Sequence, residues 1–249
     1  MDKLRFAEVC EQIVGAERAR NGIGTLGEKT LHAVLKTYFE PDSDSQEIRV
    51  GSFVADICGE NGIIEIQTRQ FYRLVKKLEA FLEYAEVTVV YPLCPVKYVR
   101  WLDPETGELS ERHKSPRRTT LHDIFSELPD IKYALDNPRF KLCVCLIEAE
   151  DIRYLNGWSK NRKRGSSRCD RVPITLIDEV WFERPEDYAR LMPDGLPEEF
   201  TSKDYAEICR TGTELARSEL NVLCYLGLVE NTGKRGRSKL YRKTLGRIE

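Results

Sequence analysis

The chain has no long hydrophobic run. No stretch of its 249 residues reaches the ~18 apolar residues that a membrane-spanning helix requires. The opening, Met1 to Arg5, is charged and leads into an amphipathic stretch, unlike the apolar region of a secretion signal. With 41% hydrophobic and 32% charged residues, the composition is that of a folded globular protein. We therefore expect a cytoplasmic protein with no membrane partner.

Metal and disulfide patterns are also missing. The eight cysteines include no CxxC pair, and His32, His113 and His122 are isolated from one another in the sequence. These spacings disfavour a zinc site. Cys143 and Cys145 share one face of an apolar run, so we expect the cysteines to be small buried hydrophobic residues in a reducing compartment.

There is also little net charge, since 39 basic and 41 acidic residues give −2. A near-neutral sum by itself disfavours a nucleic-acid partner. Charge acts over only about 8–10 Å at physiological salt, however, so its position matters more than its sum. Residues 153–171 carry +6, residues 231–248 carry +7 and residues 112–118 carry +4. Positive charge is therefore concentrated in three segments of the chain, and we expect basic surfaces there.

The periodicity of the chain predicts an α/β domain followed by a smaller one. Gly22 and Gly27 have the separation of a phosphate loop, but Glu28 intrudes before Lys29 and no apolar strand precedes the glycines. The predicted helices cover residues 4–18, 27–39, 71–82 and 121–135. The predicted strands cover residues 47–50, 53–58, 63–68, 87–93, 98–102, 140–148 and 174–182, and residues 103–120 and 156–170 are predicted loops.

Two acidic residues stand in strands that are otherwise apolar. The dipeptide Asn61-Gly62 is a strong signal for a hairpin turn. With that turn, Asp56 faces Gln67, whereas a turn one residue earlier places Asp56 opposite Glu65. Either register puts these three side chains on one face of the sheet.

Two carboxylates partly removed from water repel each other and are costly to ionise, and a bridging divalent cation removes both costs. Mg²⁺ suits such a pair, because it binds one or two carboxylates and keeps several waters. Glu28 lies in line with the core stripe of its predicted helix, so it either joins this group or complements the helix dipole. For Asp56 and Glu65 the alternative is an edge hairpin with solvated acids.

The order of Glu28, Asp56 and Glu65-Ile66-Gln67 on helix, three strands, helix and strand resembles the PD-(D/E)XK nucleases over about residues 24–93. The resemblance implies a restriction-endonuclease-like αβββαβ core in an α/β fold. It also implies that Asp56 and Glu65 hold Mg²⁺ or Mn²⁺, that Glu28 is an outer ligand or an orienting residue, and that all four polar residues take part in catalysis.

Gln67 departs from the family pattern, which has a Lys at this position. That Lys orients or activates the attacking water, whereas Gln has no positive charge and cannot act as a base. Lys76 or Lys77 could supply the charge from the following helix, or they could form a solvated helix face. A metal-dependent phosphodiesterase needs the metal to lower the pKa of water and to neutralise charge on the phosphate.

A second pattern follows residue 200. Thr201 begins a helix with Asp204 three positions on, which is a capping box. Thr213 is expected to cap a second helix that Gly227 ends. A basic hairpin follows, with its turn at residues 233–237.

This segment resembles a winged helix-turn-helix over about residues 186–247. The resemblance implies that the second helix enters the DNA major groove and that the hairpin contacts the backbone. The base-facing candidates are Arg217, Ser218 and Asn221. The phosphate-contact candidates are Lys234, Arg235, Arg237 and Lys239. Some winged helices bind only proteins.

The sequence thus predicts an N-terminal helix over residues 1–24, a nuclease-like domain over residues 25–184 and a winged-helix domain over residues 185–249. The expected function is DNA binding with Mg²⁺- or Mn²⁺-dependent phosphodiester hydrolysis. The alternatives are a catalytically inactive transcriptional regulator or an assembly factor. The expected partner is DNA, and a homodimer is left open.

Overall fold

In the computed structural model the described residues are 1–21, 30–155 and 168–244, with only the backbone described for residues 16–21. The chain forms two compact units, and neither is contiguous in sequence. The first comprises residues 1–68, 90–119 and 144–180, and the second comprises residues 69–89, 120–143 and 181–249. The second unit thus draws on two segments that the predicted division at residue 185 assigns to the nuclease-like domain.

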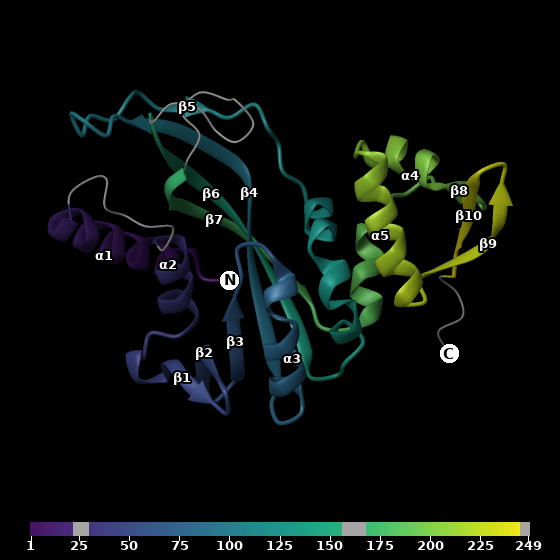
Figure 1. Ribbon diagram of the computed structural model, residues 1–249, viewed down its shortest axis with the longest axis horizontal. Coiled ribbons are helices and arrows are strands. Elements are labelled where there is room, and N and C mark those ends of the chain that lie inside the picture. Colours follow the sequence, from purple (N-terminus) through teal and green to yellow (C-terminus); the bar gives the residue numbers. More distant parts are fainter. Residues whose placement is uncertain (22–29, 156–167, 245–249) are drawn as a thin grey trace. The chain divides into compact units, whose positions relative to one another are not determined.

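The fold is mixed α/β, built around one large sheet with the order β1-β2-β3-β4-β6-β7 and with β5 paired to β4 (Figure 1). The first unit contains α1 (Lys3–Asn21), α2 (Thr30–Phe39), the 3-10 helix η1 (Ser43–Ser45), β1 (Gln46–Val50), β2 (Phe53–Gly59), β3 (Gly62–Ile66) and β5 (His113–Lys114). Three long strands have residues in both units: β4 (Val87–Leu102), β6 (Phe140–Tyr154) and β7 (Arg168–Phe182).

The long strands correct three predictions. β4 is continuous, where two strands over residues 87–93 and 98–102 are predicted, because β6 accompanies it along its length. The Val87 N–H donates to the Arg139 carbonyl at one end and the Leu155 N–H to the Leu102 carbonyl at the other, each at 2.8 Å. The two strands therefore run in the same direction. β6 extends past residue 148 to Tyr154, and β7 begins at Arg168, inside the predicted loop.

The predicted core faces are confirmed. On α2 the side chains of Leu31, Val34, Leu35 and Tyr38 are buried, at the helical spacing read from the sequence. All eight cysteines lie in the described residues, and five of them are buried, which agrees with their predicted role as small hydrophobic residues. Each helix in the described part of the chain is too short or too polar to cross a membrane.

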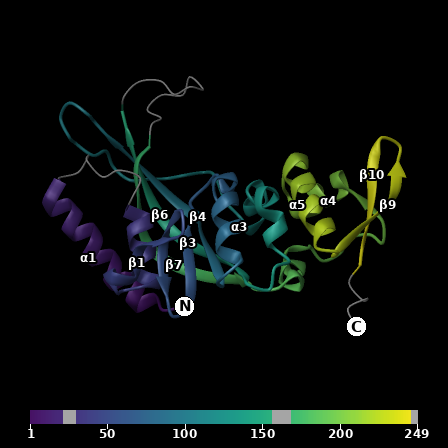
Figure 2. The ribbon, with the colours of Figure 1, turned by 60° about the horizontal axis from the view of Figure 1, so that its bottom comes forward.

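The second unit ends in two helices and a hairpin (Figure 2). A small sheet has the order β8-β10-β9. The elements are η2 (Phe71–Arg73), α3 (Val75–Leu82), η3 (Leu121–Ser126), η4 (Leu128–Ala134), η5 (Pro185–Leu191), β8 (Phe200–Thr201), α4 (Ser202–Cys209), α5 (Thr213–Tyr225), β9 (Val229–Arg235) and β10 (Ser238–Lys243).

Local chemistry accounts for the ends of these elements. The predicted helix over residues 121–135 is instead two 3-10 helices, because Pro129 removes a donor and disfavours helical geometry at Leu128. The capping box of Thr201 and Asp204 is confirmed at the start of α4. Gly212, not Thr213, is the N-cap of α5.

A buried carboxylate ties α5 to two neighbouring elements. Glu219 lies on α5 with no exposed surface. It accepts a hydrogen bond from the Tyr205 hydroxyl at 2.6 Å and lies 2.9 Å from Nδ1 of His122 on η3. The hydrogen bond with Glu219 raises the pKa of the His122 imidazole. Protonated His122 therefore stabilises this packing.

We expect the free energy of unfolding to fall as the pH rises above about 6.5, the ordinary pKa of histidine. A raised folded-state pKa gives stability that is complete below the unfolded value of ~6.5 and is lost as the pH passes through the folded value. Urea denaturation at a series of pH values measures it. His122→Gln should flatten this part of the profile, and an unchanged slope in that variant would contradict the assignment.

Candidate functional site

The β2–β3 hairpin adopts the second of the two registers considered. Cys58 pairs with Ile63 and Gly59 with Gly62, so the turn is Glu60-Asn61. Continuing this register places Asp56 opposite Glu65 on adjacent strands. β3 ends at Ile66 instead of the predicted residue 68.

The two carboxylates are largely shielded from water, and β2 and β3 are interior strands of the sheet, which excludes the edge-hairpin alternative. Glu65 is 2% exposed and the Asp56 side chain is 16% exposed. The Ile66 N–H donates to Asp56 Oδ2 at 2.8 Å, and the Asp56 N–H donates to Glu65 Oε1 at 3.3 Å. Hydrogen bonds of this kind offset part of the cost of removing a carboxylate from water.

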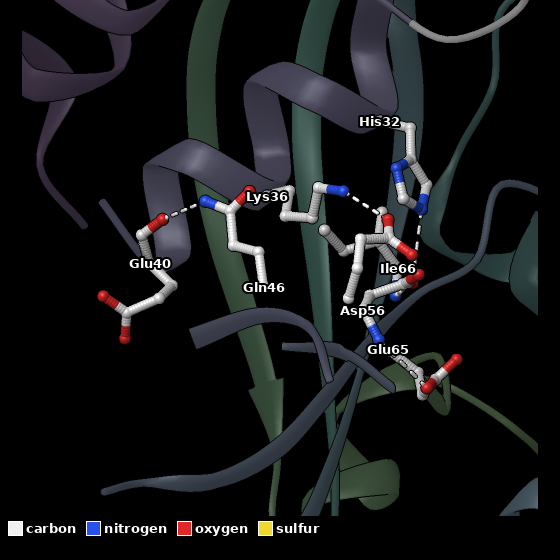
Figure 3. A network of polar contacts seen from close by, with 8 residues as sticks. His32, Lys36, Glu40, Gln46, Asp56, Glu65 and Ile66 are labelled. Atoms are coloured by element: carbon white, nitrogen blue, oxygen red, sulfur yellow. Dashed lines mark hydrogen bonds and ion pairs between the residues drawn. The ribbon is translucent and has the colours of Figure 1, made fainter. Parts of the chain in front are cut away.

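The residue that sequence reasoning missed is His32. Its Nε2 lies 3.2 Å from Asp56 Oδ2, and its side chain is 29% exposed (Figure 3). A carboxylate beside an imidazole is an arrangement that orients a proton acceptor. One signal in the sequence could have identified His32: it stands four residues, or one helical turn, after Glu28, and so on the same face of the predicted helix.

A polar stripe on α2 holds the helix against the strands. His32 and Lys36 on α2 and Glu40, which directly follows the helix, are each four residues apart. Lys36 forms an ion pair with Glu47 on β1, and the Glu40 carbonyl accepts from the Gln46 side chain at 2.8 Å (Figure 3). The stripe thus sets the position of His32 over Asp56.

The other predicted site residues do not complete the group. Glu28 lies outside the described residues, as does the basic stretch over residues 156–167. Gln67 follows β3, and its backbone N–H donates to the Val90 carbonyl at 2.9 Å. Within the described residues, no cluster of three or more His, Cys, Asp or Glu side chains is arranged as a metal site. A pair of carboxylates with water is nevertheless within the range that Mg²⁺ uses.

A second concave surface lies between α5 and the β9–β10 hairpin. We call it the basic hollow; it has a volume of about 760 Å³. Five of the predicted DNA-binding residues line it, four with basic side chains and one with an amide side chain. The lining contains no acidic residue. These five residues are Arg217, Asn221, Lys234, Arg237 and Lys239. The structure therefore brings together side chains from the helix and from the hairpin.

The two remaining candidates, Ser218 and Arg235, do not line the hollow. Arg235 Nη1 lies 3.7 Å from Asp204 Oδ2 on α4. Arg242 on β10 is also used elsewhere, with Nη2 3.0 Å from Glu199 Oε1. Among the described residues, no acid forms an ion pair with Lys234, Arg237 or Lys239. In the hairpin, the basic residues that form ion pairs within the protein are thus different from the basic residues that face the hollow.

Comparison with known proteins adds a family and a relative. A family profile described as "Domain of unknown function (DUF8091)" matches residues 29–183, which include Asp56 and Glu65 but exclude the basic hollow. An "Uncharacterized protein" of Treponema pallidum (strain Nichols) is 34% identical over 225 residues, which is 89% of this chain and 87% of the relative. No solved structure matches the chain.

Asp56→Ala should lower the free energy of unfolding by about 1–3 kcal/mol, because it leaves the Ile66 N–H and the His32 imidazole without their acceptor. Asp56→Asn retains an acceptor oxygen and should cost less. Chemical denaturation of both variants gives the comparison. Equal losses would show that the acceptor contacts do not matter.

Proposed function

The chain belongs to the family described as a domain of unknown function (DUF8091), and we propose that it binds DNA through the basic hollow. The observation that carries the proposal is the convergence of four bases from α5 and the hairpin on one concave surface with no acid in its lining. A polyanion is the partner that such a surface favours.

The arrangement assigns different roles to the two elements. Lys234, Arg237 and Lys239 lie on or beside the two hairpin strands, where they suit contacts to phosphates. Arg217 and Asn221 lie one turn apart on α5, and their side-chain types hydrogen-bond to base edges. This is the division of labour expected of a winged helix-turn-helix, which we propose as the architecture of the segment.

Replacing Lys234, Arg237 and Lys239 together by Gln should weaken duplex DNA binding. It should also reduce the slope of log K against log salt by about 3, since each phosphate contact contributes about 0.9. The matched control is Arg235→Gln, which removes one hairpin charge that pairs with Asp204 outside the hollow. Fluorescence anisotropy at several salt concentrations measures both quantities.

Two outcomes would overturn this proposal. One is the absence of DNA binding by the intact chain at low salt. The other is a triple variant with unchanged affinity and slope, which would favour the alternative of a protein-assembly module.

A second proposal concerns the core, and its support is the pair of adjacent carboxylates, of which Glu65 is buried and Asp56 is half-buried. We propose that Asp56 and Glu65 hold Mg²⁺ or Mn²⁺ in a restriction-endonuclease-like core that hydrolyses DNA phosphodiester bonds. When bound, the metal supplies Lewis-acid chemistry to water and phosphate. Asp56 orients His32, whose imidazole can accept a proton from water, a step that Gln67 cannot perform.

Incubating the full chain with DNA and Mg²⁺ or Mn²⁺ tests the enzyme. Asp56→Asn and Glu65→Gln should each lower cleavage at least about 100-fold, a loss typical of a group that acts directly in the reaction. His32→Gln should lower cleavage as well, because it removes the proposed proton acceptor. Glu79→Gln, which changes an exposed acid on α3 outside the site, is the matched control.

Cleavage that persists in the carboxylate variants would exclude this site. No cleavage of any DNA form would leave the other alternative, a DNA-binding regulator with an inactive core. In that case a gain of activity in Gln67→Lys would identify the missing Lys as the cause.

A further inference from the structure

The first unit contains a small polar cavity that is separate from both sites above. Its volume is about 160 Å³. It lies between β4, β7 and the segment that precedes η3, and its lining includes three basic residues and no acid. The bases are Lys97, Arg117 and Arg171.

A buried carboxylate, that of Asp151, holds the Arg171 side chain in place. Asp151 on β6 has no exposed surface. It accepts hydrogen bonds from Arg171 Nε at 2.6 Å and from Nη2 at 3.1 Å. A bidentate contact of this geometry fixes the plane of the guanidinium.

The same carboxylate serves two more bases. Lys97 Nζ lies 3.6 Å from Asp151 Oδ2, and Arg153 Nη2 lies 3.5 Å from the same atom. One negative charge thus faces three positive charges, which leaves these four groups at +2. Arg117 adds a further guanidinium to the lining of the cavity.

Partly buried charges of one sign repel each other, and an anion placed among them offsets this cost. Nearby, burial lowers the pKa of Arg168 to about 10, with a smaller contribution from Arg171, while Asp170 raises it.

The size of the cavity limits the ligand. At ~30 Å³ of liquid volume per water, 160 Å³ corresponds to about five waters. Organic ligands occupy pockets of about 300–1,000 Å³, so a nucleoside does not fit inside. The hydroxyls of Thr68 and Thr119 in the lining add donors suited to a tetrahedral oxyanion.

We propose that Lys97, Arg117 and Arg171 form a binding site for a phosphate group, either free phosphate or the terminal phosphate of a larger molecule. Arg171 and Lys97 are positioned by Asp151, whereas Arg117 is exposed and approaches from the loop side. The site shares no residue with the basic hollow or with the carboxylate pair, so it does not rest on the proposed function.

Calorimetric titration of the full chain with inorganic phosphate, at constant ionic strength, tests the site. We expect saturable binding to one site per chain. Arg117→Gln should weaken it at least about tenfold, the loss for a 1.4 kcal/mol contact. Arg118→Gln is the matched control, because Arg118 is the exposed neighbour with the same charge but lies outside the lining.

Lys97→Gln provides a second variant, since it removes a cavity charge while Arg171 still neutralises Asp151. Non-saturable binding, or equal affinity in the wild type, Arg117→Gln and Lys97→Gln, would overturn the proposal. Equal losses in Arg117→Gln and Arg118→Gln would also overturn it, because they would indicate general charge attraction.

The two phosphate sources are distinguished with a trinucleotide that does or does not carry a 5′-phosphate. The protein for this arm carries the Lys234, Arg237 and Lys239 substitutions, so that the basic hollow does not contribute. Preference for the 5′-phosphorylated form, lost in Arg117→Gln, would support a terminal phosphate. Binding of free phosphate alone would support the site with inorganic phosphate as its ligand.

Discussion

The cost of burying a charge without a partner organises both units of this protein. Among the described residues, five carboxylates are almost or completely inaccessible: Glu65, Glu150, Asp151, Asp170 and Glu219. Each accepts a hydrogen bond from a donor on another element or loop. Asp170, for example, accepts from the Thr30 hydroxyl at 2.5 Å, across 140 residues of sequence. Because an unpartnered buried charge costs several kcal/mol, these contacts hold only in the native arrangement.

The need to pair charged groups also decides which basic residues remain available to bind a partner molecule. In the hairpin, Arg235 and Arg242 face acids, while Lys234, Arg237 and Lys239 face the basic hollow. In the first unit the relation is reversed, because several bases converge on a single carboxylate and leave an excess of positive charge. The near-zero net charge of the chain is therefore a sum over surfaces of opposite character.

Local patterns predicted the features that depend on near neighbours. The buried face of α2, the capping box at Thr201 and the basic hairpin all follow from spacings of a few residues. The shared face of Asp56 and Glu65 also followed, because alternation along a strand is independent of register. The register itself did not, since two adjacent turns were compatible with the sequence.

Contacts between distant residues could not be predicted. His32 and His122 are isolated in the sequence, yet each lies beside a carboxylate, 24 and 97 residues away respectively. Periodicity carries no information on such pairs, because it reports which face is buried and not what covers it. The continuity of β4 past Pro95 depends in the same way on the neighbouring strand β6.

The buried position of Glu219 limits how this chain could have been assembled from smaller parts. The two terminal helices and the hairpin look like a transferable module, but the imidazole that faces Glu219 comes from η3, far upstream. A gene fragment encoding residues 185–249 alone would keep the Tyr205 hydroxyl as a donor to Glu219 but would lose the imidazole. Recombination that moved this segment into another protein would have had to bring a second partner for the acid or replace Glu219. The segment and the residues around His122 are thus expected to be inherited together.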